Sequence, residues 1–150
     1  MNKLVLVCLA ITMVLTGCNE FEKLSIAQEN GEIVFFIDKE TLEDNQAKSY
    51  IIEDFGVAKK ECKTDCVMWE IVNKADSEQQ TGESKEIKLK YGETLKNMET
   101  RHAALELKPD SYTAGGIFSL VNKENKLNSK VLHESFEVIV GSNGSIKLQK

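Results

Sequence analysis

Several residue types are scarce in this sequence, and each shortage excludes a class of protein. One Pro and nine Gly among 150 residues exclude a collagen-like chain, a proline-rich chain and a flexible linker. Two His and four Cys offer few ligands for a metal ion. The 19 Lys and Arg side chains are outnumbered by 24 Asp and Glu, so the net charge is −5, whereas a nucleic-acid-binding protein needs a basic surface to displace counterions. We therefore expect no nucleic-acid partner, no metal and no cofactor.

The remaining composition is that of an ordinary globular domain. Hydrophobic residues make up 41% of the chain and charged residues 29%, a balance that disordered chains do not have. A length of 150 residues corresponds to about one domain. The sequence shows no internal repeat and no low-complexity tract.

The N-terminal residues 1–17 have the layout of a cleaved lipoprotein signal peptide. Lys3 precedes an apolar run over residues 4–15, which would form about 18 Å of helix, well short of the roughly 30 Å hydrocarbon core of a bilayer. The next residues, Leu15-Thr16-Gly17-Cys18, resemble the bacterial lipobox, in which small residues precede a Cys that is lipidated and becomes the new N-terminus. An ordinary signal peptide that ends at a Cys by chance is the alternative.

The lipobox resemblance implies that Cys18 carries a diacylglycerol thioether and an N-acyl chain such as palmitate. One acyl chain binds a membrane marginally and two bind it stably, so three should hold the protein there permanently. Asn19 stands where Asp would be the usual inner-membrane retention signal, which implies a periplasm-facing protein of the outer membrane. Residues 18–23 would be the lipidated Cys and its tether, and residues 24–150 a single domain.

Cleavage makes the chain more acidic. It removes 17 of the 150 residues, among them Lys3, so 133 residues remain with 18 basic and 24 acidic side chains and a net charge of −6. Anionic lipid repels a domain of this charge. We therefore expect the domain to stand off the lipid surface on its tether.

Cys62 and Cys66 are the two other Cys residues that remain after cleavage. Outside the cytoplasm, two Cys this close in sequence most simply form a disulfide, which for a five-residue loop stabilises the fold by about 2 kcal/mol. A redox pair is the alternative, although such pairs favour C-x-x-C at a helix N-terminus. A zinc site would need His102 or His133, which lie far away without ligand spacing.

From residue 24 onward, the sequence indicates about eight short strands separated by turns. The turn residues Asn30-Gly31 are typical of a type I′ hairpin. Residues 39–46 are predicted as a loop or one helical turn, and residues 92–107 as irregular chain with at most one turn of helix. The expected strands are residues 24–27, 32–37, 49–59, 67–72, 87–91, 112–122, 130–140 and 146–148. Such a series without a βαβ rhythm favours an all-β fold, an antiparallel β-sandwich that is immunoglobulin-like, with Trp69 as its core aromatic residue.

The segment Leu107-x-Pro109-x-x-Tyr112 resembles the tyrosine corner of such sandwiches. In that arrangement the ring packs at the edge of the core while its hydroxyl holds the preceding loop. A Tyr that merely opens a strand is the alternative.

Nothing in the sequence predicts catalysis. The patterns of a nucleophile elbow, a Ser-x-x-Lys site, a His-Glu-x-x-His site and a Walker loop are all missing. Strand alternation places His133 on a solvent-facing side with Val131 and Ser135. Gly115-Gly116 has no following helix to help cradle a phosphate and is better explained by a β-bulge. We therefore do not expect an enzyme.

Binding is the default function for an anchored sandwich without catalytic residues. The irregular segment from residue 91 to residue 101 is the candidate surface, because ordered loops on a rigid scaffold often carry function. Tyr91, Met98 and Arg101 are its candidate partner-binding residues. In the alternative interpretation, Tyr91 and Met98 fill the sandwich edge and Arg101 pairs with Glu99 or Glu93.

Several of these segments together resemble a group of small bacterial lipoproteins, some of which are described as periplasmic immunity lipoproteins of type VI secretion systems. They are the lipobox, Cys62-x3-Cys66-x-x-Trp69, Tyr91-Gly-Glu-Thr-Leu-x-Asn-Met-Glu-Thr-Arg101 and Leu107-x-Pro109-x-x-Tyr112. The resemblance spans most of the mature chain and implies a protein that neutralises a toxin injected by neighbouring cells.

The charge of the chain is compatible with that function, because an acidic surface speeds association with a basic toxin. A structural or assembly lipoprotein of the cell envelope is the alternative, and it would show several partners or self-association. A small-ligand binder is a third interpretation, which requires a cleft.

Overall fold

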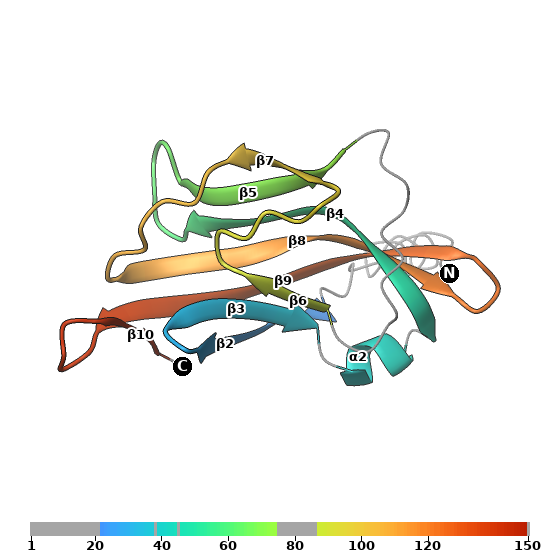
Figure 1. Cartoon of the computed structure of the whole chain (residues 1–150), viewed down its shortest axis with the longest axis horizontal. Coiled ribbons are helices and arrows are strands. Elements are labelled where there is room, and N and C mark those ends of the chain that lie inside the picture. The colour runs from blue at the N-terminus through green and yellow to red at the C-terminus, as the bar shows by residue number, and fades with distance from the viewer. Residues whose placement is uncertain (1–21, 38, 45, 75–86, 150) are drawn as a thin grey trace, which may run out of the picture.

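The computed structural model describes residues 22–37, 39–44, 46–74 and 87–149. The predicted signal peptide, Cys18 and nearly all of the polar segment 74–86 lie outside these ranges. Ten strands and one short helix form the described part of the chain (Figure 1). They are β1 (Glu22–Lys23), β2 (Ser25–Glu29), β3 (Glu32–Ile37), α2 (Lys39–Asp44), β4 (Ala47–Lys59), β5 (Val67–Asn73), β6 (Ile87–Lys90), β7 (Met98–His102), β8 (Asp110–Asn122), β9 (Leu127–Val140) and β10 (Ile146–Gln149).

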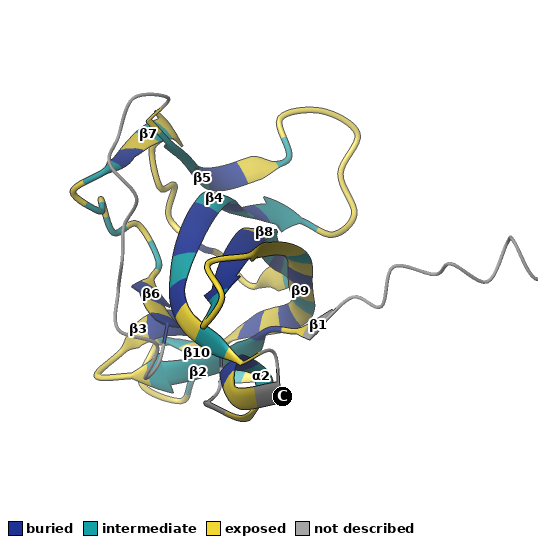
Figure 2. Cartoon of the chain, turned by 90° about the vertical axis from the view of Figure 1, so that its right-hand side faces the viewer, coloured by how far each residue is buried: buried dark blue, intermediate teal, exposed yellow. Residues whose placement is uncertain are grey.

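The strands form two sheets that pack face to face. The larger sheet has the order β1-β9-β8-β4-β5-β7, with β10 also pairing with β9, and the smaller sheet has the order β2-β3-β6. Neighbouring strands are antiparallel except β1 and β9, which are parallel. Figure 2 shows the buried residues gathered where the sheets face each other. The predicted all-β sandwich is confirmed, and its immunoglobulin-like character stays a prediction.

An aromatic cluster joins the two sheets. The ring of Phe35 on β3 lies 5.2 Å from Phe55, 6.5 Å from Trp69 and 5.9 Å from Phe136, measured between ring centroids. These three partners come from β4, β5 and β9 of the larger sheet, and Trp69 is fully buried, as the sequence predicted. Buried aromatic side chains of this size dominate core energetics.

Local turn signals in the sequence are confirmed where they were strongest. Asn30 and Gly31 both have positive φ, at 52° and 85°, and they join β2 to β3 as a type I′ turn requires. Residues 39–46 were predicted as a loop or one helical turn, and the structure shows six helical residues there, helix α2. Leu42 of this helix is buried in the core.

The tyrosine corner is also confirmed. The Tyr112 hydroxyl donates a hydrogen bond to the Lys108 carbonyl at 2.7 Å, and the Lys108 backbone N–H donates to the same hydroxyl oxygen at 3.1 Å. The ring is fully buried and stacks on Phe136 at 5.5 Å. Burial raises the pKa of the Tyr112 hydroxyl above its usual value.

Replacing Tyr112 with Phe should lower the free energy of unfolding by about 1 kcal/mol, because both hydrogen bonds to Lys108 are lost while the buried ring is kept. Urea unfolding of the two proteins measures the difference. An unchanged midpoint would mean that water replaces the hydroxyl without loss.

Two expectations about strands were wrong. Residues 98–102 are strand β7, paired with β5, and not irregular chain, because pairing with a distant strand outweighs the helical spacing of Met98 and His102. Gly115 and Gly116 continue the β4–β8 ladder in register without a bulge. Strands β1 and β7 account for the difference between the eight strands expected and the ten observed.

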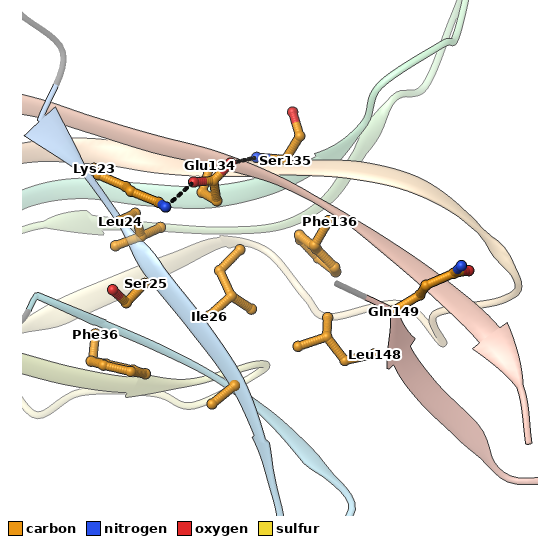
Figure 3. Close-up of a pocket in the computed structure, with 11 residues that line it drawn as sticks. Lys23, Leu24, Ser25, Ile26, Phe36, Glu134, Ser135, Phe136, Leu148 and Gln149 are labelled. Atoms are coloured by element: carbon orange, nitrogen blue, oxygen red, sulfur yellow. Dashed lines mark hydrogen bonds and ion pairs between the residues drawn. The ribbon is translucent and has the colours of Figure 1, made fainter.

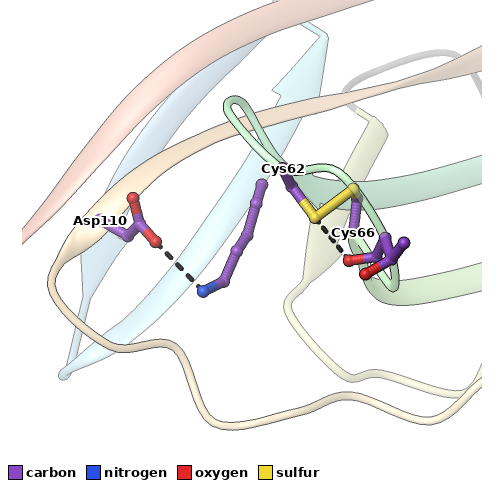
Figure 4. Close-up of a disulfide and its surroundings, with 5 residues drawn as sticks. Cys62, Cys66 and Asp110 are labelled. Carbon is purple, nitrogen blue, oxygen red and sulfur yellow. Dashed lines mark hydrogen bonds and ion pairs between the residues drawn. A yellow bond between two sulfur atoms is a disulfide. The ribbon is translucent and has the colours of Figure 1, made fainter.

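Cys62 and Cys66 form the predicted disulfide in the loop between β4 and β5 (Figure 4). Their Cα atoms lie 5.5 Å apart, and the Lys59 backbone N–H donates to the Cys66 carbonyl at 2.8 Å. Beside the loop, the Lys59 ammonium lies 3.2 Å from Asp110, whose pKa is lowered by a hydrogen bond from the Ser111 N–H and by Lys59. The disulfide therefore closes the loop at the end of β4 where the Lys59–Asp110 ion pair also links β4 to β8.

Replacing both Cys62 and Cys66 with Ser should lower the free energy of unfolding by about 2 kcal/mol, because the short loop gains freedom in the unfolded chain. The secondary structure should stay unchanged, since the pair lies outside the core. Circular dichroism with urea unfolding measures both quantities. A loss of strand content would show that the disulfide is required for folding.

Candidate functional site

The structure separates the three candidate partner-binding residues. Met98 is 2% exposed and belongs to the core, so its side chain is not available to a partner. The Tyr91 ring packs 5.5 Å from Trp69, and its hydroxyl lies 2.7 Å from the Leu105 carbonyl and 3.1 Å from the Met68 carbonyl. Burial, with a smaller contribution from Tyr112, raises the pKa of Tyr91 to about 12. These two side chains fill the sandwich edge, as the alternative interpretation had it.

Arg101 remains on the surface, with 61% of its side chain exposed. Its guanidinium lies 3.5 Å from Glu70 on β5, and His102 Nδ1 lies 2.7 Å from the other oxygen of the same carboxylate. The alternative interpretation had named Glu99 or Glu93 as the partner of Arg101. The prediction was wrong because it considered only residues near in sequence, whereas Glu70 lies on the neighbouring strand.

A β-bulge explains why two consecutive residues reach one carboxylate. Glu70 pairs with His102 and Ile71 pairs with Thr100, so Arg101 is an extra residue on β7. A bulge of this kind bends the strand and redirects a side chain. Arg101 and His102 therefore both contact Glu70, in place of alternating between the two faces of the sheet.

A shallow hollow of about 300 Å³ adjoins Glu70 on the outer face of the larger sheet. Gly56 pairs with Glu70 on β5 and with Gly115 on β8. Because Gly56 and Gly115 have no side chains, the sheet surface beside Glu70 is left open. A Cβ at Gly56 would come within 2.9 Å of the Trp69 carbonyl oxygen, which means that the strands approach too closely there for any other residue. The hollow is lined by Asp54, Phe55, Gly56, Val57, Ala58, Val67, Trp69, Glu70, Thr113 and Gly115.

We call Val67, Glu70, Arg101, His102 and the adjoining hollow the Arg101 face. Val67 is 38% exposed and lines the hollow beside Glu70. The face thus combines an exposed guanidinium, an imidazole, an apolar side chain and a recess on a rigid sheet. Arg is enriched at the energetic centres of protein interfaces, and a recess accepts a partner's side chain. The arrangement is suited to recognising another protein.

A larger groove of about 440 Å³ lies at the sandwich edge between β2 and β10 (Figure 3). Along the edge of β9 opposite β8, β1 pairs with Leu132 and His133, and β10 pairs with residues Glu137 to Val140. Residues 134–136 of β9 therefore form a gap in the pairing on that edge. In this gap the Ser135 backbone N–H donates a hydrogen bond to the Glu134 carboxylate at 3.0 Å. The same carboxylate lies 3.9 Å from the Lys23 ammonium. Leu24, Ile26, Phe136 and Leu148 supply apolar side chains to the groove. No pattern in the sequence predicts this groove, because the groove depends on where three strands end.

Two further observations concern other classes of site. Among the described residues, no group of three or more His, Cys, Asp and Glu side chains could hold a metal ion. Likewise, no helix in the described ranges is both long enough and apolar enough to span a membrane.

His133 is exposed with Val131 and Ser135, as strand alternation predicted.

Comparison with known proteins adds no relative. No protein-family model, no curated protein and no solved structure matches this chain. The resemblance to immunity lipoproteins therefore stays a hypothesis that rests on the sequence motifs.

Proposed function

We propose that this protein is a lipid-anchored, non-catalytic protein-binding module of the outer membrane, facing the periplasm, and that its partner is a secreted toxin that it neutralises. The Arg101 face is the observation that carries the proposal, because it presents an exposed Arg beside a recess on a rigid sheet. The lipobox at Cys18 and the net charge of −6 for the mature chain support the anchor and a basic partner.

A cross-linking pull-down with the tagged protein from its native cells identifies the partner. One stoichiometric, toxin-like protein encoded nearby supports the proposal, and cells that lack the lipoprotein should then be killed by that toxin. Several envelope proteins, or only further copies of this chain, would overturn it.

Replacing Arg101 with Glu should weaken binding of that partner at least about 30-fold, the loss typical of an interface hot spot. The substitution also places a second carboxylate beside Glu70. Lys123→Glu is the matched control, since it changes the charge equally in the β8–β9 turn. Calorimetric titration with the purified partner measures both variants, and equal affinities would exclude the Arg101 face as the contact.

The gap in the β9 ladder supports the alternative, an assembly lipoprotein. An extended segment of another chain could pair with residues 134–136 and place its side chains in the apolar groove, as edge strands allow. This alternative predicts self-association or several partners, and those partners should bind the Arg101→Glu variant normally.

A further inference from the structure

The charge of the mature chain is unevenly distributed. We call residues 122–130, which turn from β8 into β9, together with Lys48 of β4, the hairpin end. It contains four lysines, Lys48, Lys123, Lys126 and Lys130, and a single acidic residue, Glu124. Its net charge is therefore +3, and since the mature chain carries −6, the remaining residues together carry −9. The hairpin end is a basic region on an acidic protein.

Hydrogen bonds fix the conformation of this turn. The Asn122 side-chain oxygen accepts hydrogen bonds from the backbone N–H groups of Glu124 and Lys126, both at 2.9 Å, and the Lys48 ammonium donates to the Asn125 side chain. The turn projects Leu127, which is 58% exposed, next to Lys126. The Lys126 ammonium lies 2.8 Å from Glu124. An exposed apolar residue within a region of net positive charge suits a segment that binds the surface of a membrane.

The position of β1 brings the anchor to the same end of the molecule. Glu22 pairs with Leu132, only five residues from Leu127 along β9. Because β1 is parallel to β9, its N-terminal side faces the beginning of β9, where the hairpin end lies. The four residues from Cys18 to Glu22 span at most about 14 Å. A lipid on Cys18 would therefore hold the hairpin end close to the membrane.

We propose that the hairpin end docks on the anionic lipid surface of the membrane that holds Cys18. The inference rests on the lipid anchor of the proposed function, and it revises the expectation that the acidic domain stands off the lipid. Figure 1 shows the β8–β9 hairpin reaching past α2, the helix that carries the acidic residues Glu40 and Glu43. Docking this way also points the disulfide loop, at the other end of β4, away from the membrane.

Lysine labelling of the full lipidated protein tests the proposal. The protein is inserted into vesicles of phosphatidylcholine, with or without phosphatidylglycerol, and the acetylation rate of each lysine is measured by mass spectrometry. Lys123 and Lys126 should react roughly fivefold more slowly on the anionic vesicles, and about 1 M salt should abolish the difference. Lys63, in the disulfide loop, should react equally on both.

Two variants separate charge recognition from simple tethering. Lys123→Glu with Lys130→Glu should remove the protection of Lys126, whereas Lys60→Glu with Lys63→Glu, which changes the net charge equally at the far end, should keep it. Equal labelling on both vesicles, or protection on uncharged vesicles as well, would overturn the proposal. The mass of the intact protein reports the lipid on Cys18 separately, so that missing lipid overturns the anchor and unprotected lysines on a lipidated protein overturn only the docking.

Discussion

Replacing Cys18 with Ser should release the protein from membranes into the soluble fraction. The resemblance to a lipobox implies three acyl chains on this residue, and losing all of them removes an anchor that two chains already make stable. Fractionation of cells that produce the variant, followed by detection of the protein in membrane and soluble fractions, measures the effect.

The control for this experiment is the variant in which Cys62 and Cys66 are both replaced by Ser. It loses two Cys residues of the folded domain but keeps Cys18, so it should stay with the membrane. A Cys18→Ser protein that remains membrane-bound would contradict lipidation as the anchor.

Replacing Phe35 with Ala should have the largest effect on stability, a loss of about 3–5 kcal/mol in the free energy of unfolding. Phe35 is 1% exposed, and its ring contacts Phe55, Trp69 and Phe136 across the sandwich. The substitution leaves a cavity between the sheets that the rigid strands cannot close. Because a domain of this size is stable by only about 5–15 kcal/mol, the variant should unfold at a clearly lower urea concentration.

Phe36 offers a matched control on the same strand. Its side chain is only half-buried and lines the groove at the sandwich edge, so Phe36→Ala should cost much less than Phe35→Ala. Urea unfolding of both variants, with Phe35→Leu as a milder substitution, tests the order. Equal losses at the two positions would mean that the aromatic cluster does not hold the sheets together.

The fold could be predicted where short stretches of sequence determine the structure. Asn30-Gly31 specifies its turn because both residues tolerate positive φ. The alternation along β3 specifies that Ile33 and Phe35 share the face that packs in the core cluster, although Val34 on the other face is also buried. The tyrosine corner is likewise local, since Tyr112 reaches back only four residues to Lys108.

The candidate site could be predicted only in part, because its contacts are not local. Arg101 was identified from the sequence as a binding residue, but its pairing with Glu70 depends on a bulge between strands that lie about thirty residues apart. Met98 shares its segment with Arg101 and nevertheless points into the core. Sequence alone does not show that β7 is a strand, and without that strand the two faces cannot be told apart.

The pairing of β1 with β9 also sets an order of events during folding. Glu22 and Leu132 are 110 residues apart, so the first strand of the domain cannot pair until nearly the whole chain has been made. Contacts at such separations make β-proteins slow to fold, on a scale of milliseconds to seconds. We expect the N-terminal strand to join the sheet last, so an anchored chain would be held at the membrane before its domain has closed.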